Sequence, residues 1–112
     1  MKIVCRISAI LLCAVAVSPA GAEQRAASMY KTNCALCHGT TGEADTPAGK
    51  TFEARSLNSS DVLKMSDAEM LELIKKGKGK MPAWEEVFTD DQLKDVIAYI
   101  HTLQKSKSGP GN

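Results

Sequence analysis

The chain has 112 residues, with 14 Lys plus Arg against 13 Asp plus Glu, and 44% of its residues are hydrophobic while 4% are aromatic. This length allows one small domain. The nearly balanced charge excludes a nucleic-acid-binding protein of this size, because such a protein needs a strong basic excess.

The first 22 residues are typical of an export signal. Lys2 and Arg6 give a basic start, an apolar run of 11 residues covers 7–17, and the small residues at 20–22 offer a cleavage site. The run is too short to span a bilayer. Cleavage after Ala22 leaves 90 residues with 12 basic and 13 acidic side chains. We therefore expect a soluble exported protein in a bacterial periplasm; a thylakoid lumen is less favoured, because no transit segment precedes the signal.

The first mature segment predicts a helix with one marked face. Its members follow one another at steps of 4, 3, 1 and 3, which places two cysteines on the same side of the helix. They are Ala26, Tyr30, Asn33, Cys34 and Cys37. The next stretch, from Gly39 to about Asn58, has neither a helical nor a strand period, and it predicts a long loop.

Two later segments begin with the same helix-start signal. Ser66 followed by Glu69 has the pattern of a capping box, and Thr89 followed by Gln92 repeats it. The helix after Ser66 is expected to end near Gly77. Its expected inward face consists of Ala68, Met70, Leu71 and Ile74. The last helix has the clearest amphipathic pattern, formed by Leu93, Val96, Ile97, Ile100 and Leu103.

Together these patterns predict an all-α domain of three to four short helices. A short helical turn is expected at 59–65, and no strand pattern occurs anywhere in the sequence. The expected organisation is a cleaved signal at 1–22, one domain at 23–104 and a polar, flexible tail at 105–112.

A chain of this kind buries little apolar surface, because three short helices and a loop of about 20 residues leave most of a small domain exposed. Disulfides cannot compensate for this. Cys5 and Cys13 leave with the signal, and only Cys34 and Cys37 remain. Leu12 before Cys13 also argues against lipid attachment there. A metal or a large apolar cofactor is therefore expected inside the domain.

The sequence Cys34-Ala-Leu-Cys37-His38 has the spacing for covalent attachment of a c-type haem. Two thiols one helical turn apart can reach the two vinyl groups as thioethers, and the adjacent imidazole can reach the iron. We expect one haem c on this motif, with His38 as an axial ligand.

Three other interpretations of the motif are weaker. A zinc site needs further ligands, but His101 is the only other His and the mature chain has no other Cys. A thioredoxin-like dithiol needs a βαβ setting, which the pattern does not show. A structural disulfide across this spacing is strained, and it leaves His38 unexplained.

Met81 is the expected sixth ligand of the iron. It lies 43 residues after His38 in a glycine-rich loop, and Pro82 stiffens that loop. The other candidates fit other roles: Met29 is too close to the motif, Met70 belongs to an apolar helix face, Met65 precedes a helix cap, and His101 flanks the last apolar stripe.

These residues resemble the class I c-type cytochromes, in particular the small single-haem proteins of bacteria and algae. The resemblance runs from about Ala26 to Leu103 and rests on CALCH, on GKGKMPAW, and on an aromatic pairing of the first and last helices. It implies the cytochrome c fold around one haem, with Ala26 and Tyr30 meeting Tyr99. It also implies that a proline carbonyl holds the second nitrogen of His38; Pro47 is the candidate, with Gly49 and Lys50 as alternatives.

The resemblance implies electron transfer by a monomeric carrier that is not an enzyme, and a methionine ligand suits that task because it raises the haem potential. We expect Arg55 and Trp84 to contact the haem propionates, with a surface position and core packing as the respective alternatives. The lysines before Met81 could steer an acidic redox partner, or simply end a helix. They are Lys75, Lys76, Lys78 and Lys80. Two other functions stay open: a haem enzyme or gas sensor in which Met81 dissociates, and a subunit of a larger redox complex.

Overall fold

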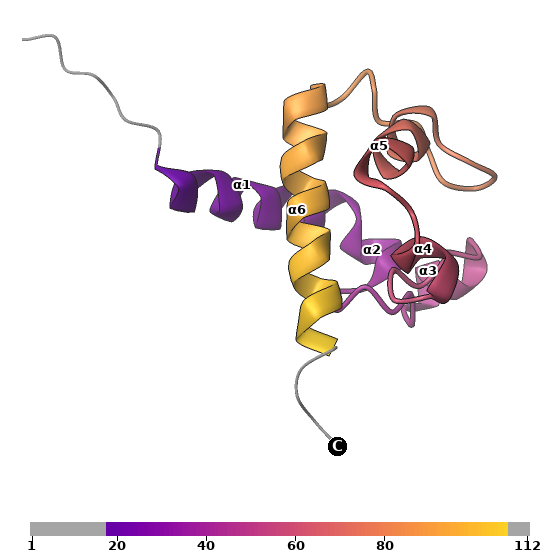
Figure 1. The fold of residues 1–112 in the computed structure, drawn as a ribbon. Helices are drawn as coiled ribbons and strands as arrows, with labels where there is room; N and C mark the ends of the chain where they lie inside the picture. The colour runs from indigo at the N-terminus through magenta and orange to yellow at the C-terminus, as the bar shows by residue number, and fades with distance from the viewer. Residues whose placement is uncertain (1–17, 108–112) are drawn as a thin grey trace, which may run out of the picture.

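A computed structural model describes residues 18–107 of the chain. All regular elements in this range are helices, which confirms the predicted all-α fold. In chain order they are α1 (Pro19–Asn33), α2 (Ala35–His38), α3 (Pro47–Thr51), α4 (Ser60–Leu63), α5 (Asp67–Lys76) and α6 (Asp90–Lys107). Figure 1 shows α6 crossing α1, with α5 to one side of α6 and the three short helices grouped below α5.

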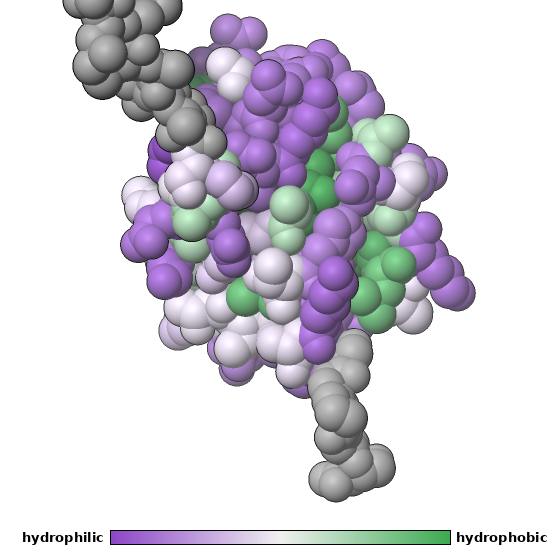
Figure 2. Space-filling model, turned by 60° about the vertical axis from the view of Figure 1, so that its left-hand side comes forward, coloured by the Kyte–Doolittle hydropathy of each residue, from purple (hydrophilic) through white to green (hydrophobic). Residues whose placement is uncertain are grey.

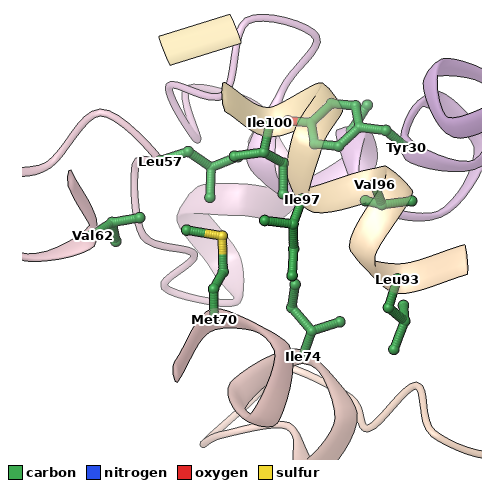
Figure 3. Packing of buried hydrophobic residues seen from close by; sticks show 10 residues of the cluster. Tyr30, Leu57, Val62, Met70, Ile74, Leu93, Val96, Ile97 and Ile100 are labelled. Atoms are coloured by element: carbon green, nitrogen blue, oxygen red, sulfur yellow. The ribbon is translucent and has the colours of Figure 1, made fainter. Parts of the chain in front are cut away.

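The core lies where α6 packs against α1 and α5. Tyr30 of α1 and Ile97 of α6 are its most deeply buried large side chains. Figure 3 shows Met70 and Ile74 of α5 pointing toward Ile97. The predicted stripe of α6 is confirmed, because Leu93, Val96, Ile97 and Ile100 are buried, and Leu103 is partly buried and packs against the same cluster. Ala68 was expected on the inward face of α5 but is exposed, since it lies about 120° round the helix from Ile74.

The first and last helices meet through the expected aromatic pair. The rings of Tyr30 and Tyr99 lie 5.4 Å apart at an interplanar angle of 55°, and Ala26 is buried beside them on α1. The Tyr30 hydroxyl donates a 2.7 Å hydrogen bond to the carbonyl oxygen of Gly39. Burial raises the pKa of Tyr30 well above its usual value, so this hydroxyl keeps its proton and ties α1 to the end of α2.

Both predicted helix-start signals are formed. The Ser66 hydroxyl accepts a hydrogen bond from the Glu69 N–H, and the Glu69 carboxylate accepts one from the Ser66 N–H. Thr89 and Gln92 exchange the same pair of bonds at the start of α6. Each exchange satisfies two backbone donors that a helix start leaves without a partner.

Two predicted boundaries differ from the structure. α6 continues to Lys107, three residues beyond the expected end of the domain, because the Lys107 ammonium lies 2.6 Å from the Glu43 carboxylate and holds the last turn against the loop. α3 lies within the stretch predicted as an irregular loop. Residues 1–17 and 108–112, which hold most of the predicted signal and the end of the predicted tail, lie outside the described residues. Cleavage after Ala22 stays a prediction, and it would fall within α1.

One face of the molecule is largely polar, with hydrophobic residues scattered over it (Figure 2). No helix within residues 18–107 is long and apolar enough to cross a membrane. Within the described residues, four large apolar side chains are at least half exposed: Leu36, Phe52, Leu63 and Val87.

His101, a candidate for the iron in the sequence, instead joins α5 to α6. Its Nε2 lies 2.7 Å from a carboxylate oxygen of Asp67, and its Nδ1 lies 2.8 Å from the side-chain oxygen of Gln104. The amide nitrogen of Gln104 in turn donates to the carbonyl oxygen of Leu57. Hydrogen bonds to Asp67 and Gln104 raise the pKa of His101, since both partners accept from the doubly protonated ring.

This contact predicts a pH-dependent stability. A histidine whose pKa is raised by folding stabilises the protein fully below its unfolded pKa of about 6.5, and this stabilisation is lost as the pH rises through the folded pKa. We expect the wild type to exceed His101→Gln in free energy of unfolding by more at about pH 5.5 than at about pH 9. Urea titrations of the two proteins measure this difference, because urea, unlike guanidinium, does not screen an ion pair. An equal difference at both pH values would contradict the ion pair with Asp67.

Candidate functional site

The cysteine motif begins at a kink between two helices. α1 ends at Asn33, and Cys34 starts α2 by accepting hydrogen bonds from the N–H groups of Cys37 and His38 at 3.2 and 2.9 Å. Cys34 and Cys37 are both free thiols and both half-buried. Burial, with a smaller effect of Cys37, raises the pKa of Cys34 to about 11. The predicted single helix through the motif is thus two helices, and both thiols stay available for covalent attachment.

His38 is oriented by a backbone carbonyl, but not by the one that was expected. Its Nδ1 lies 2.9 Å from the carbonyl oxygen of Arg55. The assignment of this role to Pro47 is wrong in this structure, because Pro47 begins α3 and its carbonyl accepts from the Thr51 hydroxyl instead. Since a carbonyl only accepts, the proton of His38 sits on Nδ1 and the lone pair of Nε2 is left for a metal. Burial lowers the pKa of His38 despite the bond to Arg55, which favours the neutral ring that a ligand requires.

α3 packs against the cysteine motif, and the sequence pattern did not predict this helix. Thr46 caps α3 by accepting from the Gly49 N–H at 2.9 Å, and its hydroxyl donates to the carbonyl oxygen of Leu36 at 2.6 Å. α3 therefore packs directly on α2. Threonine followed by proline at Thr46 and Pro47 is a known helix start, and this signal could have revealed the element.

Gly49 makes this contact possible. A Cβ atom at position 49 would lie 2.2 Å from the carbonyl oxygen of Cys37 and 2.8 Å from that of Ala44. Both atoms belong to the backbone, so neither can move aside without displacing the motif. Any side chain here would push α3 away from Cys37.

Gly49→Ala is therefore expected to lower the free energy of unfolding by about 1–3 kcal/mol, the usual cost of overpacking, and to reduce the yield of haem-loaded protein. Gly79→Ala is the control: a Cβ there meets nothing within 4 Å, and only the positive φ of 58° is strained, at a cost of about 1 kcal/mol. Guanidinium unfolding compares the two. The steric account fails if Gly49→Ala is no more destabilising than Gly79→Ala.

Met81 lies in a tight turn that follows α5. The backbone N–H of Lys78 donates to the carbonyl of Met81 at 3.2 Å, and the N–H of Met81 donates back at 2.9 Å. Gly77, at a φ of 71°, lets the chain leave α5; a Cβ there would lie 2.6 Å from the Met81 carbonyl oxygen. The half-buried side chains of Met81 and Cys34 pack against the same core cluster. The structure thus brings the methionine loop and the cysteine motif to one core.

Trp84 and Arg55 already have partners within the protein. Trp84 is half-buried and stacks on Phe88, with ring centroids 5.7 Å apart, and its backbone N–H donates to Ile74. The guanidinium of Arg55 forms an ion pair with Asp61. Core packing therefore explains Trp84, and contacts of either residue with haem propionates stay predictions.

The lysines near Met81 are mostly paired with acids. Lys75 lies 3.0 Å from Asp90, Lys76 lies 2.7 Å from Glu85, and Lys80 lies 3.4 Å from Glu53. Of the four predicted lysines, Lys78 is the one that makes no ion pair with another residue of the 18–107 range. The expected positive rim is thus largely balanced by carboxylates, which weakens its steering of an acidic partner.

The described residues fit a covalently attached haem. Two free thiols, a neutral histidine with its Nε2 lone pair available, and a thioether against the same core supply what such a group requires. Nowhere in residues 18–107 do three His, Cys, Asp or Glu side chains gather as a metal site, so the ligands of a structural zinc ion are not assembled there. Two surface pockets of about 330 and 360 Å³ flank α1. Neither is lined by Cys34, Cys37, His38 or Met81.

Comparisons with known proteins find similar sequences and a similar structure. A family model described as cytochrome c oxidase, cbb3-type, subunit III matches residues 21–100. The cytochrome c6 of Gloeothece citriformis is 37% identical over 98 residues, which cover 83% of this chain and 82% of that protein. The cbb3-type cytochrome c oxidase subunit CcoP of Azospirillum brasilense is 31% identical over 90 residues, which cover 79% of this chain but 30% of that protein.

A solved structure supports the fold. A c-type cytochrome superposes with a TM-score of 0.60 at 24% sequence identity, covering 71% of this chain and 94% of the other. At this identity the likeness concerns the arrangement of the helices.

Proposed function

The chain belongs to the cytochrome c family, among the small class I cytochromes c, and we propose that it carries single electrons between redox proteins through one haem ligated by His38 and Met81. Proteins of this family bind haem c covalently. The observation that carries the proposal is the bond from His38 Nδ1 to the Arg55 carbonyl. It leaves Nε2 free for iron while Met81 packs on the same core as Cys34.

The chain's residues divide the task among them. Cys34 and Cys37 would each add the S–H bond across a haem vinyl group to form a thioether, and His38 and Met81 would bind the haem iron. The haem supplies the one-electron couple of its iron. A soft methionine sulfur favours the reduced state, whereas the hydrogen bond of His38 to Arg55 strengthens the imidazole as a ligand. Because Cys34 and Met81 pack against the same core cluster, few atoms need to move when the haem gains or loses an electron.

The proposed setting is the bacterial periplasm, with the chain acting as a monomer after removal of residues 1–22. The N-terminal pattern of basic start, apolar run and small residues supports export. The proposed partners are redox proteins that dock transiently. Balanced charge around Met81 favours partners recognised by shape and apolar contact more than by strong charge attraction.

A second candidate function is that of an electron-transfer subunit in an oxidase complex. It is favoured by the match to the oxidase subunit III model and by the CcoP relatives, although the chain spans only about 30% of their length. Fractionation of the native host separates the two: a carrier is recovered in the periplasmic fraction, whereas a subunit co-purifies with the membrane oxidase.

Exposure of the reduced protein to carbon monoxide tests the proposal against a haem enzyme or gas sensor. With His38 and Met81 both bound, the ferrous spectrum is expected to be low-spin and unchanged by the gas at neutral pH. Rapid uptake of carbon monoxide by the native protein would instead show that the iron has a free coordination position. This result would contradict the proposed carrier function.

A further inference from the structure

The orientation of His38 depends on a carbonyl that belongs to an arginine. The Nδ1 proton of His38 is donated to the Arg55 oxygen, 17 residues along the chain. A stronger bond at this nitrogen makes the imidazole a better donor through its other nitrogen. Whatever fixes the backbone at position 55 therefore affects the iron ligand.

The backbone around Arg55 has no regular structure to hold it. Its neighbours are held by hydrogen bonds: the Ala54 N–H donates to Gly49 and the Leu57 N–H to Gly42, at 2.8 and 2.7 Å. The carbonyl oxygen of Ser56 accepts from the N–H and the hydroxyl of Ser59. The N–H of Arg55 itself donates to no backbone oxygen of the described chain. A proline at this position would fix φ near −65°, but an arginine leaves that angle free. The side chain of Arg55 adds a restraint at this residue itself.

The Arg55 side chain is tied to a helix. Its guanidinium pairs with the carboxylate of Asp61, in the first turn of α4. Val62, the next residue, is buried in the core and anchors this helix. A hydrogen bond from Ser59 and the charge of Arg55 both lower the pKa of Asp61, so the group is a carboxylate at neutral pH. The pair thus connects the core, through α4, to the segment whose carbonyl holds His38.

We propose that Asp61 is a positioning residue for His38: by holding the Arg55 side chain against α4, it keeps the Arg55 carbonyl in place for the Nδ1–H bond. This inference rests on the proposed role of His38 as an iron ligand. It assigns to the exposed ion pair a function other than stability, since pairs of this exposure contribute only about 0.2–1 kcal/mol.

The first test is Asp61→Asn in the haem-loaded protein, with two readouts. Exchange of the His38 Nδ1 proton with solvent, followed by nuclear magnetic resonance of the ferrous state, should become about 1.5- to 5-fold faster if the pair restrains opening by its usual free energy. The midpoint potential should rise, because a less basic imidazole stabilises ferric iron less. Asp91→Asn is the matched control: Asp91 is also in a first helical turn and pairs with Lys94 at 3.5 Å, but on α6.

The second test shows whether Asp61 acts through Arg55. Arg55→Gln should shift both readouts in the same direction, and the double variant should shift them no further than either single one. The proposal is overturned if Asp61→Asn behaves like Asp91→Asn, if the two shifts add, or if only Arg55→Gln moves the potential, which would give the arginine to a haem propionate. Failure of the proposed function is visible separately, as a ferrous spectrum without two axial ligands in the wild type.

Discussion

The double variant Cys34→Ser with Cys37→Ser is expected to give no haem-stained band on a denaturing gel and to lose most of its helical circular dichroism. Serine hydroxyls do not form the thioethers that hold the haem. The chain then has to fold on a core of three helices and three helical turns, and a domain of about 90 residues with so little buried surface is marginal.

The matched control lies in the same chain. Cys13 is within the predicted signal, so Cys13→Ser should leave the haem stain and the dichroism of the mature protein unchanged. If the double variant still carried covalent haem at the wild-type level, the attachment site would lie elsewhere. If it folded fully without haem, the view that the cofactor completes the core would be wrong.

Met81→Ala is expected to keep the covalently bound haem but to leave one coordination position of its iron free. The ferrous protein should then bind carbon monoxide rapidly, and its midpoint potential should fall by a sizeable part of the roughly 0.8 V range that axial ligands determine. The reason is that alanine offers no donor, while Cys34, Cys37 and His38 are untouched. Spectra with and without the gas, and a redox titration, measure both effects.

Met65→Leu serves as the control for this change. Met65 is also half-buried and packs against the same core cluster, but it lies before the cap of α5. Its replacement should leave the potential and the closed iron unchanged. Carbon monoxide binding by Met65→Leu and not by Met81→Ala would move the ligand from one methionine to the other.

Local signals predicted α5 and α6 well. The start of α5 at Ser66 and Glu69, its end at Gly77 and the buried stripe of α6 follow from patterns of a few residues. Such patterns report contacts within one helix or on one face of it. Element boundaries that depend on distant partners were missed, as at Lys107, whose contact with Glu43 spans 64 residues.

The candidate site likewise combines residues that a local pattern predicts with contacts that no local pattern predicts. Cys34, Cys37 and His38 are recognisable because their chemistry requires a fixed spacing. The carbonyl that orients His38 has no side-chain signature, since any residue can supply it, and the path of an aperiodic segment decides that Arg55 rather than Pro47 does. Likewise, the lysines near Met81 predicted a positive rim. Two of their acidic partners, Glu53 and Asp90, come from other segments, so the sequence around Met81 does not show that these charges are balanced.

The most direct test of the central claim is nuclear magnetic resonance of the ferrous protein with ¹³C-labelled methionine methyl groups. The mature chain would contain Met29, Met65, Met70 and Met81. A methyl group held over the haem plane experiences a large ring-current shift, so we predict one methyl resonance far upfield of the other three, and its loss in Met81→Ala. Four resonances in the ordinary range, or an upfield one that survives this substitution, would contradict ligation by Met81.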